Sequence, residues 1–271
     1  MSGMHPFDTA TLLELLPDGS FRGHTSPAYA NMVGPFGGVT AAGLLQAPMQ
    51  HPSRQGEPVA LTVNFAAALA DGEFHIAARA LRTNRSTQHW AMELTQSGEV
   101  AASATAVFAL RRATWSAPEA APPPDLPPPD TLVRAPLIGR PAWTHRYDMR
   151  FVRGDLPEVF DAQHRPDSVT QVWVRDEPPR ALDFVALASL CDSFFPRVFV
   201  RRRQATPIGT VSLTTYFHAD SALLQAQGER HVLGTAHALN FRNGYFDQSA
   251  EVWSDAWQLL ASSHQIVYYR E

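Results

Sequence analysis

Apolar and polar residues along the chain recur with two periods, one typical of helices and one typical of strands. In the first half, the apolar stretch 39–49 predicts a helix that ends before Pro52, because helices tend to stop ahead of proline. Polar turn residues divide the rest of this half into strand-like runs. These runs cover residues 19–24, 57–68, 73–81, 90–95 and 100–111.

The second half repeats this pattern. A helix is predicted at about 182–195, and Asn243-Gly244 predicts a hairpin turn. Strands are predicted at 143–152, 168–174, 210–218, 231–241, 245–253 and 256–269. One long helix with several antiparallel strands, present twice, describes an α+β fold in which each helix lies on a sheet.

The two halves also match residue by residue. The tract 58–65 reads like 210–217 at an offset of 152, with Leu61 over Leu213. Two later segments match in the same order at slightly larger offsets: 80–81 with 238–239 at 158, and 100–111 with 259–270 at 159. Ordered matches with a slowly drifting offset indicate an internal duplication, in which two loop insertions absorb the drift.

Polar side chains distinguish the two copies. The second copy carries Asp192, Thr210 and Gln265. The first copy has an apolar residue near Leu45, and it has Pro58 and Ala106 in place of the other two. This asymmetry predicts one active site per chain, built mainly from the second copy.

A proline-rich segment separates the copies. Residues 116–141 hold nine of the 22 prolines, and proline both fixes φ and removes a backbone donor. We expect a semi-rigid, extended linker rather than a ligand for a proline-binding domain. The predicted division is 1–113 and 143–271 for the two folded units, with 114–142 as the linker.

The composition excludes several classes of protein. A net charge of −4 argues against nucleic-acid binding, which usually needs a basic surface. The single Cys191 excludes an internal disulfide framework and a multi-cysteine metal site, and it suits a reducing compartment. Signal-peptide features are missing from the N-terminus, and no apolar run is long enough to cross a bilayer. We therefore expect a cytoplasmic protein without a membrane span.

The predicted second helix places a carboxylate in apolar surroundings. Asp183 is a plausible N-cap, and Asp192 follows a face of small residues. The predicted core stripe holds Phe184, Leu187, Cys191, Phe194 and Val198. Desolvation of Asp192 would raise its pKa and suit it to proton transfer. The alternative is that Asp192 marks an exposed edge of the helix.

Two further polar residues lie on predicted strands. Strict alternation places Thr210 on the same face as Ser212 and Thr214, a face that is either wet or lines a polar pocket. Gln265 lies in a very apolar stretch, so its amide must find a hydrogen-bond partner. Alternation points His264 to the opposite face, which favours packing or surface exposure over a catalytic role.

A glycine-rich turn precedes the first predicted helix. In Gly34-Pro-Phe-Gly-Gly38, no side chain obstructs the first helical turn, so free N–H groups could hold a carbonyl oxygen. Dinucleotide, P-loop, zinc-protease and serine-hydrolase motifs are missing. The arginines Arg197 and 201–203 follow the second helix. They are either a solvated run favoured by the helix dipole or contacts to the phosphates of a nucleotide-bearing substrate.

These residues resemble the acyl-CoA thioesterase II group of double-hotdog thioesterases over nearly the full chain. The segments that carry the resemblance are Phe36-Gly-Gly38, Leu81-Arg-Thr-Asn-Arg-Ser86, residues 187–192, Thr210 with Phe217-His218, and Leu260-Ala-Ser-Ser-His-Gln265. The chain departs from the family at Asn84, where glycine is usual, and at Thr62, where histidine is common. The resemblance implies an α+β double hotdog, in which each antiparallel sheet wraps around a long helix.

The resemblance also implies a function. Asp192, Thr210 and Gln265 would hold a water that hydrolyses an acyl-CoA thioester, without a metal or another cofactor. The expected substrate-binding residues are Phe36, Gly37, Gly38, Arg85 and Arg201. Two alternatives stay open: a non-catalytic binder of acyl-CoA or another hydrophobic ligand, and an acyl-thioester hydratase. A homo-oligomer, with a dimer as the first guess, is the expected assembly.

Overall fold

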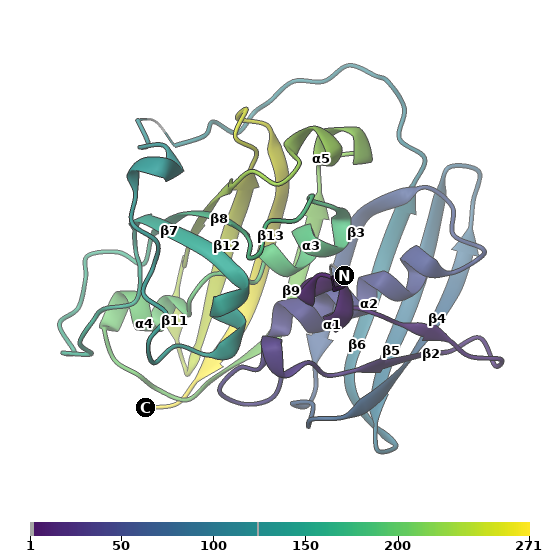
Figure 1. Cartoon of the computed structure of the whole chain (residues 1–271), viewed down its shortest axis with the longest axis horizontal. Helices are drawn as coiled ribbons and strands as arrows, with labels where there is room; N and C mark the ends of the chain where they lie inside the picture. Colours follow the sequence, from purple (N-terminus) through teal and green to yellow (C-terminus); the bar gives the residue numbers. More distant parts are fainter. Residues whose placement is uncertain (1–2, 124) are drawn as a thin grey trace.

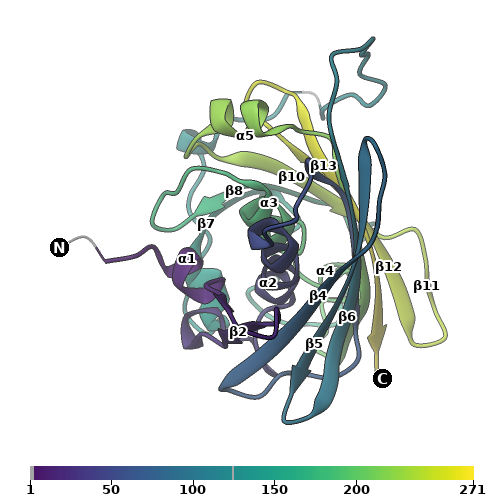
Figure 2. The same cartoon turned by 90° about the vertical axis from the view of Figure 1, so that its right-hand side faces the viewer.

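The structure is a computed structural model that describes residues 3–123 and 125–271. Its strands form one antiparallel sheet that curls around two central helices (Figures 1 and 2). The strand order is β1-β2-β4-β5-β6-β3-β9-β13-β12-β10-β8-β7, with β11 paired to β12. The first six strands along this path come from the first half of the chain and the others from the second half. This is the α+β arrangement predicted from the repeated pattern.

The first half supplies β1 to β6. Their bounds are β1 (Glu14–Leu15), β2 (Phe21–His24), β3 (Glu57–Phe65), β4 (Glu73–Thr83), β5 (Thr87–Gln96) and β6 (Glu99–Ala109). The second half supplies β7 (Tyr147–Arg153), β8 (Thr170–Asp176), β9 (Ile208–Phe217), β10 (Val232–His237), β11 (Phe241–Arg242), β12 (Tyr245–Trp253) and β13 (Leu259–Tyr269). The predicted strands at 143–152 and 231–241 are therefore shorter than expected at one end, because residues 142–146 form a 3-10 turn and β10 stops at His237.

Within the described residues, five α-helices accompany the sheet. They are α1 (Pro6–Ala10), α2 (Gly37–Gln50), α3 (Phe184–Leu190), α4 (Arg197–Arg202) and α5 (Ser221–Gln227). Short 3-10 helices are η1 (Pro27–Tyr29), η2 (Pro129–Thr131) and η3 (Ala142–Arg146). The short helices α4 and α5 were not predicted. No helix in the described ranges has the length and apolar character that crossing a membrane requires.

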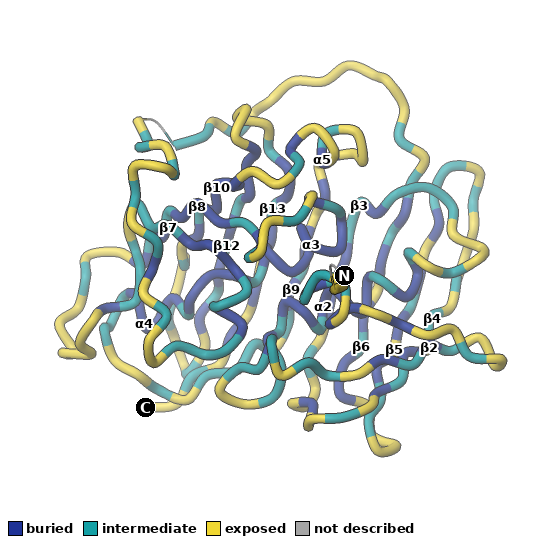
Figure 3. Tube along the Cα trace, in the orientation of Figure 1, coloured by how far each residue is buried: buried dark blue, intermediate teal, exposed yellow. Residues whose placement is uncertain are grey.

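The two central helices, α2 and α3, lie side by side and are buried by the sheet (Figures 2 and 3). The predicted helix over 182–195 is too long, because α3 ends at Leu190 and Cys191 is its C-cap. Asp192 therefore lies in the turn after the helix rather than on it. Pro196 separates this turn from α4, since a proline ring cannot continue a helix in which its nitrogen must donate.

The duplication is visible in the strand registers. Leu61 pairs with Ala106 between β3 and β6, and the counterparts Leu213 and Gln265 pair in the same way between β9 and β13. At the centre of the sheet β3 pairs with β9, and there Thr62 lies opposite Thr214. These two residues are each other's counterparts at the offset of 152, and their Oγ1 atoms are 3.0 Å apart. A pseudo-two-fold axis therefore passes between them.

Each copy has a β-bulge at the same place. Between β9 and β13 the register shifts, so that Ser212 pairs with Ile266 while Thr210 pairs with Val267. Val211 is the extra residue and is exposed. A bulge reverses the facing of the residues beyond it, so Thr210 points inward, and the prediction from strict alternation is wrong. In β3 the register shifts in the same way, and the residue between Pro58 and Ala60 is the extra one.

The proline-rich segment runs without helix or strand from residue 110 to its short 3-10 turn η2, apart from the undescribed residue 124. It arches from the first half to the second over the upper edge in Figure 1. Leu126 and Leu132 pack on the outer cluster of Trp173, Leu233 and Trp253, and Trp173 Nε1 donates to the Pro127 carbonyl at 2.9 Å. The segment therefore covers part of the second copy's sheet.

Candidate active site

Asp192 and Gln265 form a direct hydrogen bond. Gln265 is on β13, 5% exposed, and its Nε2 donates to Asp192 Oδ1 at 2.6 Å. The expectation that the Gln265 amide needs a buried partner is confirmed, and the partner is the carboxylate. His264, which precedes Gln265 in the strand, is exposed on the other face, as alternation predicted.

The start of α2 lies against the same carboxylate. A Cβ on Gly37 would be only 2.7 Å from Asp192 Oδ2, and one on Gly38 would be 2.6 Å from the Ser189 carbonyl oxygen. Only glycine permits this approach of backbone to backbone and to the carboxylate. The first N–H groups of a helix have no intrahelical acceptor and carry a partial positive charge. The first copy therefore contributes a positive helix end to an acid from the second copy.

The pKa of Asp192 is raised from 3.8 to about 7. Burial is the main cause, since desolvation disfavours the charged form. Hydrogen bonding by Gln265 and by the backbone of Gly38 lowers the pKa and opposes part of this shift. A carboxyl group with a pKa near neutrality can both accept and release a proton at physiological pH.

A cavity of about 410 Å³ opens on this carboxylate. Asp192, Gln265, Thr210 and Gly37 all line it, so the structure brings together the three predicted polar residues and the glycine turn. Aromatic side chains form much of the remaining wall: Phe36, Phe65, Trp143, Phe194, Phe195, Phe199 and Phe246. The volume lies in the range of small-molecule sites, which are mostly apolar with a few convergent polar groups.

The predicted residue Phe36 fixes one wall of the cavity. Its ring is buried and stacks on Trp143, with centroids 4.3 Å apart and an interplanar angle of 7°. Phe36 belongs to the first copy and Trp143 to the second, so this stack joins the halves next to the glycine turn. Gly38 does not itself line the cavity but contacts the Asp192 turn behind it.

The predicted arginines are not at this cavity. Arg85 is exposed in the turn between β4 and β5, at the Glu57 end of β3, whereas the cavity lies at the Phe65 end. Arg201 is on α4, and its Nη1 donates to the Arg165 carbonyl. The interpretation of Arg197 as part of a solvated run is wrong, because its side chain is fully buried and donates to the Ser168 carbonyl at 2.9 Å.

Sequence reasoning missed Gln248 on β12. It lies directly opposite Gln265 in the register, lines the cavity and is 2% exposed. Its Nε2 is buried without a hydrogen-bond partner among the described residues. The offset of 158 places Gln248 over Trp90 of the first copy, and this polar-for-aromatic exchange was a signal that the sequence already contained.

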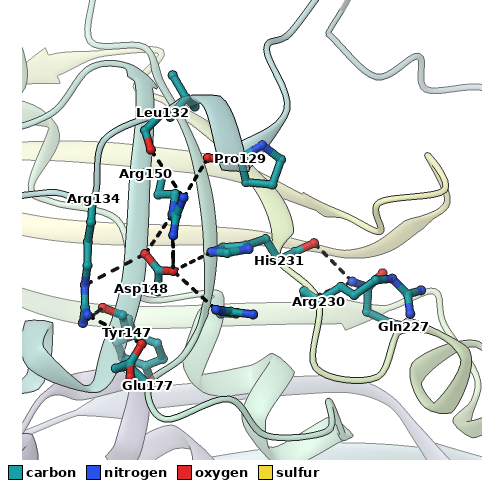
Figure 4. Close-up of polar contacts among 11 residues, drawn as sticks. Pro129, Leu132, Arg134, Tyr147, Asp148, Arg150, Glu177, Gln227, Arg230 and His231 are labelled. Atoms are coloured by element: carbon teal, nitrogen blue, oxygen red, sulfur yellow. Dashed lines mark hydrogen bonds and ion pairs between the residues drawn. The ribbon is translucent and has the colours of Figure 1, made fainter.

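A second polar cluster centres on Asp148 of β7, outside the cavity (Figure 4). Its carboxylate accepts from Arg150 Nη2 at 3.0 Å, and His231 Nε2 lies 3.0 Å away. Arg150 also donates to the Pro129 carbonyl at 3.0 Å. Burial raises the pKa of Asp148, but the Arg150 hydrogen bond and the charge of His231 outweigh it, so the pKa lies below its usual value. The cluster ties the linker to the edge strand β7.

Within residues 3–123 and 125–271, no three His, Cys, Asp or Glu side chains are grouped so that they could hold a metal ion.

Two family profiles match the chain. An acyl-CoA thioesterase N-terminal domain matches residues 26–109, and an acyl-CoA thioesterase C-terminal domain matches residues 118–269. No match is found among curated proteins.

Solved structures match over the full length. A protein of unknown function with a hot dog fold from Alicyclobacillus acidocaldarius is 47% identical, with 99% of each chain covered and a TM-score of 0.93. An acyl-CoA thioesterase II, TesB2, from Mycobacterium marinum is 20% identical, with 97% of this chain and 98% of that chain covered and a TM-score of 0.76. A tesB protein from Mycobacterium avium subs paratuberculosis is 16% identical, with 100% of each chain covered and a TM-score of 0.79.

Proposed function

Because the chain belongs to the acyl-CoA thioesterase family and has the hotdog fold twice, we propose that it hydrolyses an acyl-CoA thioester to a free acid and CoA. The observation that carries this proposal is the Asp192 carboxyl, whose pKa of about 7 and hydrogen bond from Gln265 occur at a mostly apolar cavity. These features suit general-base catalysis near neutral pH.

In this proposal a water molecule is held by Asp192, Thr210 and Gln265. Asp192 takes a proton from the water as its oxygen bonds to the thioester carbonyl carbon. The carbonyl π electrons move to oxygen, and the C–S bond then breaks as the carbonyl reforms. CoA leaves as a thiolate, which the proton held on Asp192 neutralises. Water and thioester are thereby converted to acid and thiol, with no other reactant consumed.

The start of α2 would stabilise the negative oxygen of the intermediate. The Gly37 N–H has no intrahelical acceptor, and Gly37 lines the cavity beside Asp192. A backbone donor preorganised in a site of low dielectric stabilises developing charge more strongly than the same donor does in water. The acyl chain would lie along the aromatic walls, where its burial contributes about 0.8 kcal/mol per methylene.

A panel of saturated acyl-CoAs of increasing chain length tests the function. We expect release of free CoA thiol with each turnover and, in ¹⁸O-labelled water, one labelled oxygen in the acid product. Tight binding of the thioesters without thiol release would contradict hydrolysis and identify a binding protein instead. A product hydrated on its acyl chain with the thioester intact would identify a hydratase. Light scattering on the same sample tests the expected homodimer.

A further inference from the structure

Each copy has a buried glutamine on a strand, and the two glutamines differ in their hydrogen bonds. Gln88 on β5 and Gln248 on β12 are each 2% exposed. The Gln88 amide is fully used: its Nε2 donates to the Ser53 carbonyl and to Thr83 Oγ1, both at 2.9 Å. Its Oε1 accepts from the Gln55 backbone N–H at 2.8 Å and from Trp90 Nε1 at 3.0 Å. In contrast, the Nε2 of Gln248 has no partner among the described residues.

A buried amide without a partner costs free energy that an apolar side chain of the same shape would not. Gln248 lines the cavity, and its neighbours on the same wall include the apolar side chains of Phe246 and Val267. The first copy has Trp90 at the corresponding position, where the ring is 1% exposed and fills its space. The amide therefore lies beside Gln265 on the cavity wall, and its Nε2 has no hydrogen-bond partner among the described residues. That atom has almost no exposed surface, so a ligand oxygen bonds to it only after the side chain turns toward the cavity that Gln248 lines.

The register fixes the position of Gln248 relative to Gln265 and Asp192. Gln248 lies directly opposite Gln265, which bonds to Asp192. Opposed residues of antiparallel strands have Cα atoms roughly 5 Å apart. If the thioester carbonyl sits at Asp192, the Gln248 amide therefore lies within a few bond lengths of that carbonyl.

We propose that Gln248 determines substrate specificity by hydrogen-bonding an oxygen on the acyl chain close to the thioester. The preferred substrate class is then an acyl-CoA with a hydroxyl or carbonyl oxygen within the first few carbons, rather than a saturated acyl-CoA. This inference rests on the proposed hydrolase function. A site with a buried group that needs a polar partner discriminates strongly against analogues that lack that partner.

Three thioesters of equal chain length test the proposal: hexanoyl-CoA, 3-hydroxyhexanoyl-CoA and 6-hydroxyhexanoyl-CoA. We expect the wild-type protein to show a kcat/KM for the 3-hydroxy compound about tenfold above that for hexanoyl-CoA. The variant Gln248→Met keeps the side-chain length and removes the amide. In this variant we expect the preference to reverse in favour of hexanoyl-CoA. A wild-type ratio at or below one, or a preference for the 6-hydroxy compound, would overturn the proposal.

Thermal unfolding separates specificity from a structural role. Gln248→Met should unfold at the same temperature as the wild type or higher, because an unpartnered amide is lost. The matched control Gln88→Met should unfold at a lower temperature and keep the wild-type ratio between substrates, since that amide bonds only to protein. If Gln248→Met lowers the unfolding temperature and leaves the ratio unchanged, the amide is structural and the proposal is wrong.

The same compounds keep the two proposals distinguishable. If none of the three thioesters releases CoA, the proposed hydrolase function fails. Calorimetric titration of the intact thioesters then still decides on Gln248. Tighter binding of 3-hydroxyhexanoyl-CoA to wild type, lost in Gln248→Met, would support the assignment, and equal binding to both proteins would overturn it.

Discussion

The candidate active site and its pseudo-symmetric counterpart in the first copy share a backbone and differ in their side chains. Both sites lie where a bulged strand pairs with the strand that carries Gln265 or its counterpart Ala106. In the first copy Pro58 and Ala106 stand in place of Thr210 and Gln265, and the position of Asp192 falls on an apolar residue near Leu45. Leu45, Pro58 and Ala106 are all buried. The scaffold alone therefore does not make a site.

The phenylalanines at the two positions are packed differently. Phe65 lines the cavity, whereas its counterpart Phe217 is 2% exposed and meets Phe184 edge to face, with centroids 5.8 Å apart. Helix length adds to the difference, since α2 has 14 residues and α3 only 7. The shorter α3 is followed by the turn that carries Asp192 and part of the cavity wall. A break in one helix thus opens a pocket where its partner helix fills the space.

Replacing the acid should have the largest effect. We expect Asp192→Asn to lower kcat for acyl-CoA hydrolysis about 10³-fold, because a positioned general base contributes roughly 10² to 10⁴. Thiol release under saturating substrate measures it. Hydrolysis within a few-fold of wild type would remove Asp192 from the mechanism.

The same variant has a stability signature. The folded-state pKa of about 7 exceeds the model-compound value of 3.8, so between these pH values the folded protein holds a proton that the unfolded chain has released. The free energy of unfolding of the wild type should therefore fall as pH rises from about 4 to about 7. In Asp192→Asn the part of this pH dependence that comes from Asp192 should be lost. Urea unfolding at pH 5 and pH 8 measures the difference.

Replacing Phe65 and Phe217, which correspond to each other in the two copies, by alanine tests the contrast between a filled and an open position. Phe217→Ala should reduce the free energy of unfolding by about 3 kcal/mol, because it leaves a void in the packed core. This void lies at the position that corresponds to the active site by the pseudo-symmetry. Phe65→Ala should cost about 1 kcal/mol, because one side of that ring already faces a cavity. Chemical denaturation compares them. Equal losses would mean that the two positions are packed alike.

Removing the partner of the acid should have a moderate effect on rate and a distinctive effect on pH dependence. Gln265→Leu should lower kcat about thirtyfold, in line with the loss of a hydrogen bond to a charged group. The Gln265 hydrogen bond lowers the Asp192 pKa, so its loss should move the rising limb of the pH–rate profile above pH 7. A rising limb at unchanged pH would show that the hydrogen bond does not set the acidity of the base.

The smallest effect is expected at the bulge. Thr210→Val keeps the shape of the side chain and removes its hydroxyl, so we expect a loss of about fivefold in kcat, consistent with one net hydrogen bond. Substituting the counterpart, Pro58→Val, should leave kcat unchanged. If both substitutions change kcat equally, the inward hydroxyl of Thr210 has no special part in holding the water.

The sequence predicted the repeated elements and the offset well, because hydrophobic periodicity and long matched tracts survive single substitutions. It failed at Thr210, since alternation assumes an unbroken pleat and the bulge at Val211 reverses the strand face. It also placed Asp192 on the helix, because the apolar run continues through Phe195 although the helix ends at Leu190. Helix ends depend on tertiary contacts that a local pattern does not contain.

The candidate site was predictable only in part. Asp192 and Gln265 are far apart in sequence, and their hydrogen bond depends on how β13 meets the turn after α3. Gln248 was missed because a lone glutamine on a strand is common, although its counterpart Trp90 marked the position as buried. Comparing the two copies position by position would have singled it out.

The contact between Thr62 and Thr214 has a genetic consequence. In a dimer of identical chains, a residue on the two-fold axis meets its own copy, and each mutation alters both sites at once. Here the two threonines face each other in one polypeptide, so each half mutates independently. One half can keep an acid and an amide while the other carries apolar residues at the corresponding positions, and a change in one half leaves the other half unaltered.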